Sequence, residues 1–170
     1  MRENSLLYYL YYDLERLEKP SFKSFLKWYF IPRGHCFRWN VWFRIVQCIK
    51  NGGVKKILII PTYLMYRHYE YKYGIHVNTN IDVGKGLFIV HGDGVYINAK
   101  SVGENFTCYQ GVTVGLGNNG IPEIKDNVII YTNAVVVNDI ILYDGCIIGA
   151  CSFVNKSVNE KSVVIGIPAK

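Results

Sequence analysis

The chain has 170 residues, of which half are apolar and only 19% are charged, so wholesale disorder is excluded and one ordinary hydrophobic core is expected. The net charge of +6 is carried mostly by lysines and arginines before Gly74, where aromatic residues are also concentrated. This mixture favours an anionic partner, either a phosphorylated substrate or lipid head groups, although an ordinary solvated helix face has the same composition. Nucleic acid is excluded as a partner, because the basic residues are dispersed and form no known binding motif.

Five cysteines form neither a CxxC pair nor a spacing typical of zinc, so we predict no metal site. Their odd number, and the lack of a signal-peptide pattern at the start, favour the reducing cytoplasm. The longest apolar run, Ile57 to Met65, is far shorter than the roughly 20 residues that a membrane span needs. We therefore expect a cytoplasmic protein, and leave open a peripheral contact between residues 1–73 and the inner face of the membrane.

Residues 1–73 are predicted to form a helical domain. Apolar residues at a helical period, interrupted by proline and glycine, predict four helices: one from residue 4 that stops before Pro20, one at 21–30, one from residue 37 that Gly52-Gly53 closes, and one from about 55 toward 73. Ser21 is the expected N-cap of the second helix. Pro61 is expected to kink the fourth helix or to delay its start.

After Gly74 the apolar residues follow a period of six. Stepping by six gives three series: Val77, Val83, Ile89, Val95; Val102, Cys108, Val114; and Ile124, Ile130, Val136, Leu142, Ile148, Val154. Such a period fits neither a helix nor a hairpin, but is typical of a solenoid in which each segment is a short parallel strand and a turn. Three segments make one triangular coil of about 18 residues, with the apolar side chain pointing inward. Residues 77–154 then amount to about four to five coils.

Two breaks in this period mark where the solenoid is interrupted. The step from Val95 to Val102 has one residue too many, and the step from Val114 to Ile124 has four too many. The second break, GLGNNGIP, is rich in glycine and asparagine and is expected to project as a loop. Because insertions in solenoids often build the binding site, we expect His91, about one coil earlier, to face this loop.

Three stretches carry a resemblance to a known family: VGKGLFIVHGDGVYI, VGENFTCYQGVTVGLG and the final VNKSVNEKSVVIGIPAK. They resemble the hexapeptide-repeat acyltransferases of the serine acetyltransferase branch, and within it the short O-acetyltransferases of surface-polysaccharide pathways. The resemblance covers residues 74–170 well and the helical part loosely. It implies a mainly β fold, with a left-handed parallel β-helix at 74–170 and an N-terminal α-helical domain at 1–73. It also implies a homotrimer with active sites between subunits, and acetyl-coenzyme A as co-substrate.

The resemblance places His91 at the family's catalytic histidine. Acetyl transfer to a hydroxyl needs a base, and an imidazole can take the proton and return it to the leaving thiol within a ternary complex. The alternative is a structural histidine. The group that orients His91 stays open between His76, which stands where serine acetyltransferases have an aspartate, Asp93, and a carboxylate of a neighbouring subunit.

The remaining site residues follow from the resemblance alone. Tyr109 and Gln110 belong to the shared motif, and either touch the acceptor or hold the coil. Small side chains would line a slot for the pantetheine arm of the coenzyme, and two lysines would meet its phosphates. The residues that match these positions are Gly115, Gly117, Thr132, Ala134, Ala150, Lys156 and Lys170.

Two departures from serine acetyltransferases bear on the acceptor. Val90 stands where that family has an aspartate before the histidine, and Gly120 and Ile121 stand where it has an Arg-His pair. Those groups hold the charged ends of the amino acid, so we expect instead a sugar hydroxyl on a saccharide or lipid-linked saccharide, in surface polysaccharide biosynthesis. The alternatives are serine O-acetylation in cysteine biosynthesis and a non-catalytic trimeric β-helix scaffold.

Overall fold

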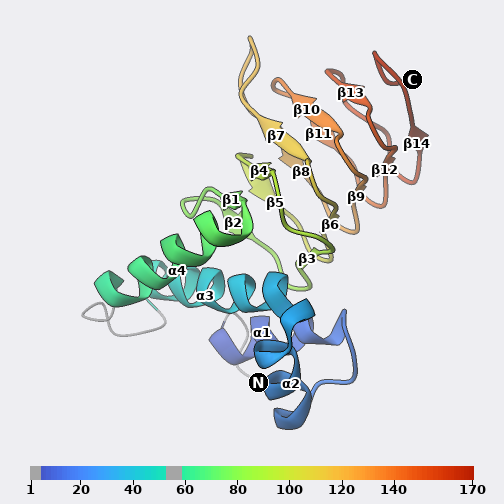
Figure 1. The fold of residues 1–170 in the computed structure, drawn as a ribbon. Coiled ribbons are helices and arrows are strands. Elements are labelled where there is room, and N and C mark those ends of the chain that lie inside the picture. The colour runs from blue at the N-terminus through green and yellow to red at the C-terminus, as the bar shows by residue number, and fades with distance from the viewer. Residues whose placement is uncertain (1–4, 53–58) are drawn as a thin grey trace.

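A computed structural model describes residues 5–52 and 59–170, and helices come first along the chain (Figure 1). They are α1 (Leu6–Glu15), α2 (Phe22–Phe30), the 3₁₀ helix η1 (Pro32–Gly34), α3 (His35–Lys50) and α4 (Ile59–Tyr73). The four predicted helices are confirmed, although the expected start of the fourth near Lys55 lies outside the described residues. Ser21 caps α2 as predicted, because its side chain accepts a hydrogen bond from the Ser24 N–H and the Ser24 hydroxyl accepts one from the Ser21 N–H.

Short parallel strands follow in three sheets, which wind into a three-sided β-helix (Figure 1). Sheet A is made of β1 (Ile75–Val77), β4 (Val95–Ile97), β7 (Thr113–Gly115), β10 (Val135–Val137) and β13 (Phe153–Val154). Sheet B is made of β2 (Asp82–Val83), β5 (Ser101–Val102), β8 (Glu123–Ile124) and β11 (Ile141–Leu142). Sheet C is made of β3 (Phe88–Ile89), β6 (Thr107–Cys108), β9 (Ile129–Ile130), β12 (Ile147–Ile148) and β14 (Val163–Val164). Each of the first four turns adds one strand to each sheet, and the fifth adds one to sheets A and C, so the predicted solenoid is confirmed.

The residues at the period of six form the interior of this β-helix. All members of the three predicted series are buried, including Cys108. The first predicted break is nevertheless misplaced. Ile97 rather than Val95 pairs with Val77 and Val114, so the extra residues lie before Val95, in the turn that follows His91. Asp93 and Gly94 adopt φ of 68° and 78° in this turn, a left-handed conformation that widens the corner.

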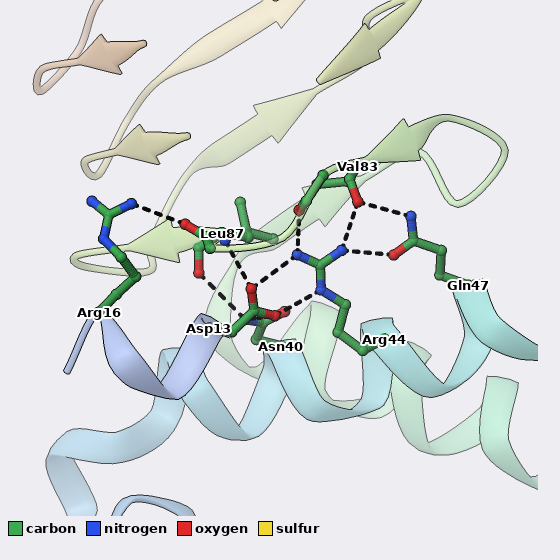
Figure 2. A network of polar contacts seen from close by, with 9 residues as sticks. Asp13, Arg16, Asn40, Arg44, Gln47, Val83 and Leu87 are labelled. Atoms are coloured by element: carbon green, nitrogen blue, oxygen red, sulfur yellow. Dashed lines mark hydrogen bonds and ion pairs between the residues drawn. The ribbon is translucent and has the colours of Figure 1, made fainter. Parts of the chain in front are cut away.

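A buried ion pair fastens the helices to the first coil (Figure 2). The Arg44 guanidinium on α3 donates to both carboxylate oxygens of Asp13 on α1, at 2.7 and 3.0 Å, and to the carbonyls of Val83 and Gly84, at 2.7 and 2.6 Å. Asp13 in turn accepts the Leu87 N–H at 2.8 Å. The segment that leads from β2 to β3, and then to His91, is therefore hydrogen-bonded directly to the helical part.

We expect Ile148→Ala to lower the free energy of unfolding by about 2–5 kcal/mol, because the side chain is fully buried and leaves a cavity that its neighbours in the stack cannot fill. Ile148 stands between Ile130 and Val164 in the interior column of sheet C. Urea unfolding followed by circular dichroism measures the change. Ile165→Ala, at a side chain that is 65% exposed, is the control and should change stability by less than about 0.5 kcal/mol. Equal losses in the two variants would contradict the assigned interior.

Candidate functional site

His91 lies at the corner where sheet C passes into sheet A, which we call the C/A edge. It follows β3, its residue is exposed, and no hydrogen bond or ion pair of its imidazole is recorded within the described residues. The turn after it rests on the end of α4, where the Asp93 N–H donates to the Tyr73 carbonyl at 2.8 Å. A Cβ on Gly92 would come within 2.7 Å of that carbonyl, so this position requires glycine. His91 is thus held out from the coil on a fixed turn and is not packed in the core.

Several predicted site residues line up above His91 along the C/A edge. The register of sheet C aligns Ile89, Cys108, Ile130 and Ile148. The residues two positions after each of these form one column along the edge: His91, Gln110, Thr132 and Ala150. The rings of Tyr109 and Tyr131, one position earlier, stack at 4.9 Å. The structure therefore brings His91, Tyr109, Gln110, Thr132 and Ala150 to a single edge.

Other predicted coenzyme residues lie at a second corner, where sheet A passes into sheet B, which we call the A/B edge. Gly115 ends β7, and Gly117 lies in the loop that projects between β7 and β8 (Figure 1). Lys156 is exposed just after β13, at the same edge. The expectation that His91 faces this loop is therefore wrong within one chain, because His91 follows a strand of sheet C and the loop follows a strand of sheet A.

Two further coenzyme candidates have different surroundings. Ala134 is 0% exposed and belongs to the hydrophobic core, so it cannot line a surface slot, and its prediction as a coenzyme-binding residue is wrong. A small side chain suits a tight interior corner as well as it suits a channel. Lys170 is exposed, and its N–H donates to the Ile165 carbonyl at 3.1 Å just beyond β14.

The two candidates for orienting His91 make other contacts. The Nδ1 atom of His76 lies 3.3 Å from Oε1 of Glu70, a buried acid on α4 that the sequence analysis did not single out. Asp93 is exposed on the turn after His91. Within the described residues neither His76 nor Asp93 is recorded in contact with His91. The orienting role predicted for each stays a prediction.

A cavity of about 370 Å³ opens beside His91, between the helices and β3. Charged or polar side chains from α1, η1, α3 and the turn after β3 line it, and they include Asp13, Arg33, His35, Asn40 and His91. The first turn of α3 forms one wall, where burial raises the pKa of the Cys36 thiol to about 12 and the thiol contacts the backbone of Gly92. This cavity could not be predicted from the sequence, because nothing in the local pattern shows that residues 13, 33 and 91 meet.

The described residues contain neither a group of three or more His, Cys, Asp or Glu side chains able to hold a metal ion, nor a helix long and apolar enough to cross a membrane.

No model of a known protein family matches the sequence. The serine acetyltransferase of Staphylococcus aureus (strain N315) is 43% identical over 102 residues, which cover 56% of this chain and 47% of that protein. The serine acetyltransferase of Staphylococcus xylosus is 42% identical over the same length. Over the matched residues, this chain is similar to the hexapeptide-repeat β-helix of the serine acetyltransferases. The match spans about half the length of these relatives.

Solved serine acetyltransferases share the fold. The Neisseria gonorrhoeae enzyme in complex with serine superposes with a TM-score of 0.76 at 24% identity, over 97% of this chain and 68% of that one. The Brucella abortus enzyme in complex with coenzyme A superposes with a TM-score of 0.73 at 22% identity, over 95% of this chain and 65% of that one. The predicted fold, a parallel β-helix with N-terminal helices, is therefore confirmed.

The residues at which this chain departs from the serine acetyltransferase motif lie in two different places. Val90 lines the cavity beside His91. Gly120 closes the projecting loop by accepting the Gly117 N–H at 3.0 Å, and Ile121 follows it. The positions of the family's Arg-His pair are therefore uncharged here, and they lie at the A/B edge, away from the cavity within one chain.

Proposed function

We propose that this chain is an acetyl-coenzyme A-dependent O-acetyltransferase with His91 as general base. The observation that carries the proposal is an exposed histidine on a fixed turn, at a cavity large enough for a small acceptor. The imidazole would take the proton of the acceptor hydroxyl as its oxygen attacks the thioester carbonyl. A C–O ester bond then forms as the C–S bond breaks, and the imidazolium returns the proton to the departing thiolate.

We propose serine as the acceptor. The relatives that match are named serine acetyltransferases, and they do not support the sugar acceptor expected from the sequence. A saccharide is kept as the second candidate because Val90, Gly120 and Ile121 leave uncharged the positions that hold the amino acid in the family. The peripheral membrane contact left open by the sequence also lacks support and is not part of the proposal.

The coenzyme and the oligomer are proposed together. Thr132 and Ala150 lie in the same column as His91 on the C/A edge, whereas Gly115, Gly117 and Lys156 lie on the A/B edge of the same chain. A ring of three copies would place the C/A edge of one copy beside the A/B edge of the next, so that residues from both edges would line one pantetheine slot. Light scattering of the purified protein tests this arrangement, with a trimer as the expected result and a monomer as the contradicting one.

Thiol release from acetyl-coenzyme A tests the activity and its acceptor. Serine and a panel of sugars and nucleotide sugars are supplied separately to the same enzyme preparation. We expect thiol release above the acceptor-free rate with serine. Release with a sugar and not with serine would replace the proposed acceptor by the second candidate. No release with any acceptor, from a folded protein, would favour the non-catalytic scaffold.

A further inference from the structure

The cavity beside His91 contains an Arg-His pair that lies outside the three stretches on which the family resemblance rests. Arg33 lies in η1 and His35 begins α3, and both line the cavity together with His91. We propose that Arg33 and His35 bind the carboxylate of the acceptor, in place of the family pair whose positions are held here by Gly120 and Ile121. The inference rests on the proposed function and narrows the acceptor to a small carboxylate that bears a hydroxyl, such as serine.

The backbone fixes this pair in place. Gly34 lies between Arg33 and His35. A Cβ at this position would come within 1.7 Å of the Trp28 carbonyl oxygen, so only glycine fits here. Arg38, one turn further along α3, donates to the carbonyls of Tyr29 and Ile31 at 2.7 and 3.0 Å. The link between α2 and α3 is therefore fixed by the close approach at Gly34 and by the hydrogen bonds of Arg38. Arg33 and His35 lie in and next to this link, and both line the cavity.

The charge of the cavity favours an anion. Asp13 is the only acidic residue among those that line it, and its carboxylate is already bound by Arg44 and by the Leu87 N–H (Figure 2). Within the described residues Arg33 has no recorded ion pair. The N-terminus of α3 at Gly34 has no side-chain cap and no acid in its first turn, so the helix dipole adds to the positive potential. A carboxylate ligand would neutralise the positive charge of this wall.

An unpaired acceptor in the same cavity suits the other end of such a ligand. Asn40 lines the cavity and is 5% exposed, and its Nδ2 donates to Asp13 at 3.0 Å and to the Leu87 carbonyl at 3.4 Å (Figure 2). These two acceptors fix the orientation of the amide, because flipping it would set Oδ1 against a carboxylate and a carbonyl. Oδ1 itself has no partner among the described residues. An ammonium or hydroxyl group of the acceptor is the donor that this atom requires.

The test compares serine with ethanolamine, which keeps the hydroxyl and the amine and lacks the carboxylate. We expect Arg33→Gln to raise the KM for serine by about 10- to 100-fold, the range for losing a charge-assisted hydrogen bond. The KM values for ethanolamine and acetyl-coenzyme A should stay within about twofold. Arg33→Lys should fall between wild type and Arg33→Gln, because it keeps the charge and loses the planar fork. Lys23→Gln, which removes an exposed charge from α2 outside the cavity, is the matched control.

An unchanged KM for serine in Arg33→Gln, or equal losses for serine and ethanolamine, would overturn the inference. Isothermal titration of serine into the same proteins separates this failure from failure of the proposed function. If no thiol is released with any acceptor, but serine binds the wild type at least tenfold more tightly than it binds Arg33→Gln, the carboxylate site is supported although the proposed activity fails. If the wild type does not bind serine, the inference is overturned.

Discussion

Replacing His91 with alanine is expected to lower kcat for acetyl transfer by about 10²- to 10⁴-fold, the usual contribution of a general base. The KM for acetyl-coenzyme A should change little, because the imidazole acts on the acceptor proton and makes no contact required for coenzyme binding in the proposed mechanism. Thiol release at saturating serine and varied acetyl-coenzyme A measures both constants.

The variant is informative because His91 is exposed and contributes little to packing. The free energy of unfolding of His91→Ala should therefore stay within about 0.5 kcal/mol of wild type. His68→Ala is the matched control, since His68 is also exposed but lies on α4 and does not line the cavity beside His91. Full activity in the control, with loss in His91→Ala, is the expected pattern. Full activity in both variants would make His91 a structural residue.

The largest loss of stability is expected from Asp13→Ala. The side chains of Asp13 and Arg44 are both 0% exposed, and removal of the carboxylate leaves the guanidinium buried without its counter-charge. Breaking one side of a buried ion pair costs about 3–5 kcal/mol. The Leu87 N–H would lose its acceptor as well. Urea denaturation of wild type and variant measures the difference.

Glu15→Ala is the control for this experiment. Glu15 lies on α1 two residues after Asp13, but it is exposed, so its removal should change stability by less than about 0.5 kcal/mol. A loss below about 1 kcal/mol in Asp13→Ala would mean that the helices are held to the first coil mainly by apolar contacts. The polar network of Figure 2 would then be secondary to them.

The β-helix could be predicted from sequence because each coil repeats the same physical requirement. A residue that stacks inside the β-helix must be apolar. The chain returns to each side of the β-helix after a nearly fixed number of residues, so the pattern is visible in the sequence. Where two neighbouring inward positions are both apolar, as at Val95 and Ile97, the pattern no longer identifies which one continues the stack. The break was therefore assigned to the wrong side of β4.

The site was harder to predict, because it depends on contacts between distant segments. Asp13 meets Arg44 and Leu87, and Glu70 meets His76, only after the helices have packed on the first coil. Ala134 shows a second limit, since a small residue fits an interior corner and a coenzyme slot equally well. The motif around His91 predicted a catalytic histidine, but many of the residues that line the cavity beside it come from helices whose own pattern shows only amphipathic packing.

The most direct test of the central claim is mass spectrometry of the product that forms when the folded protein is incubated with acetyl-coenzyme A and serine. We predict O-acetylserine from the wild type, and no more than the uncatalysed amount from His91→Ala. An equal amount from both proteins, or none from the wild type while a sugar in the same assay is acetylated, would contradict the account.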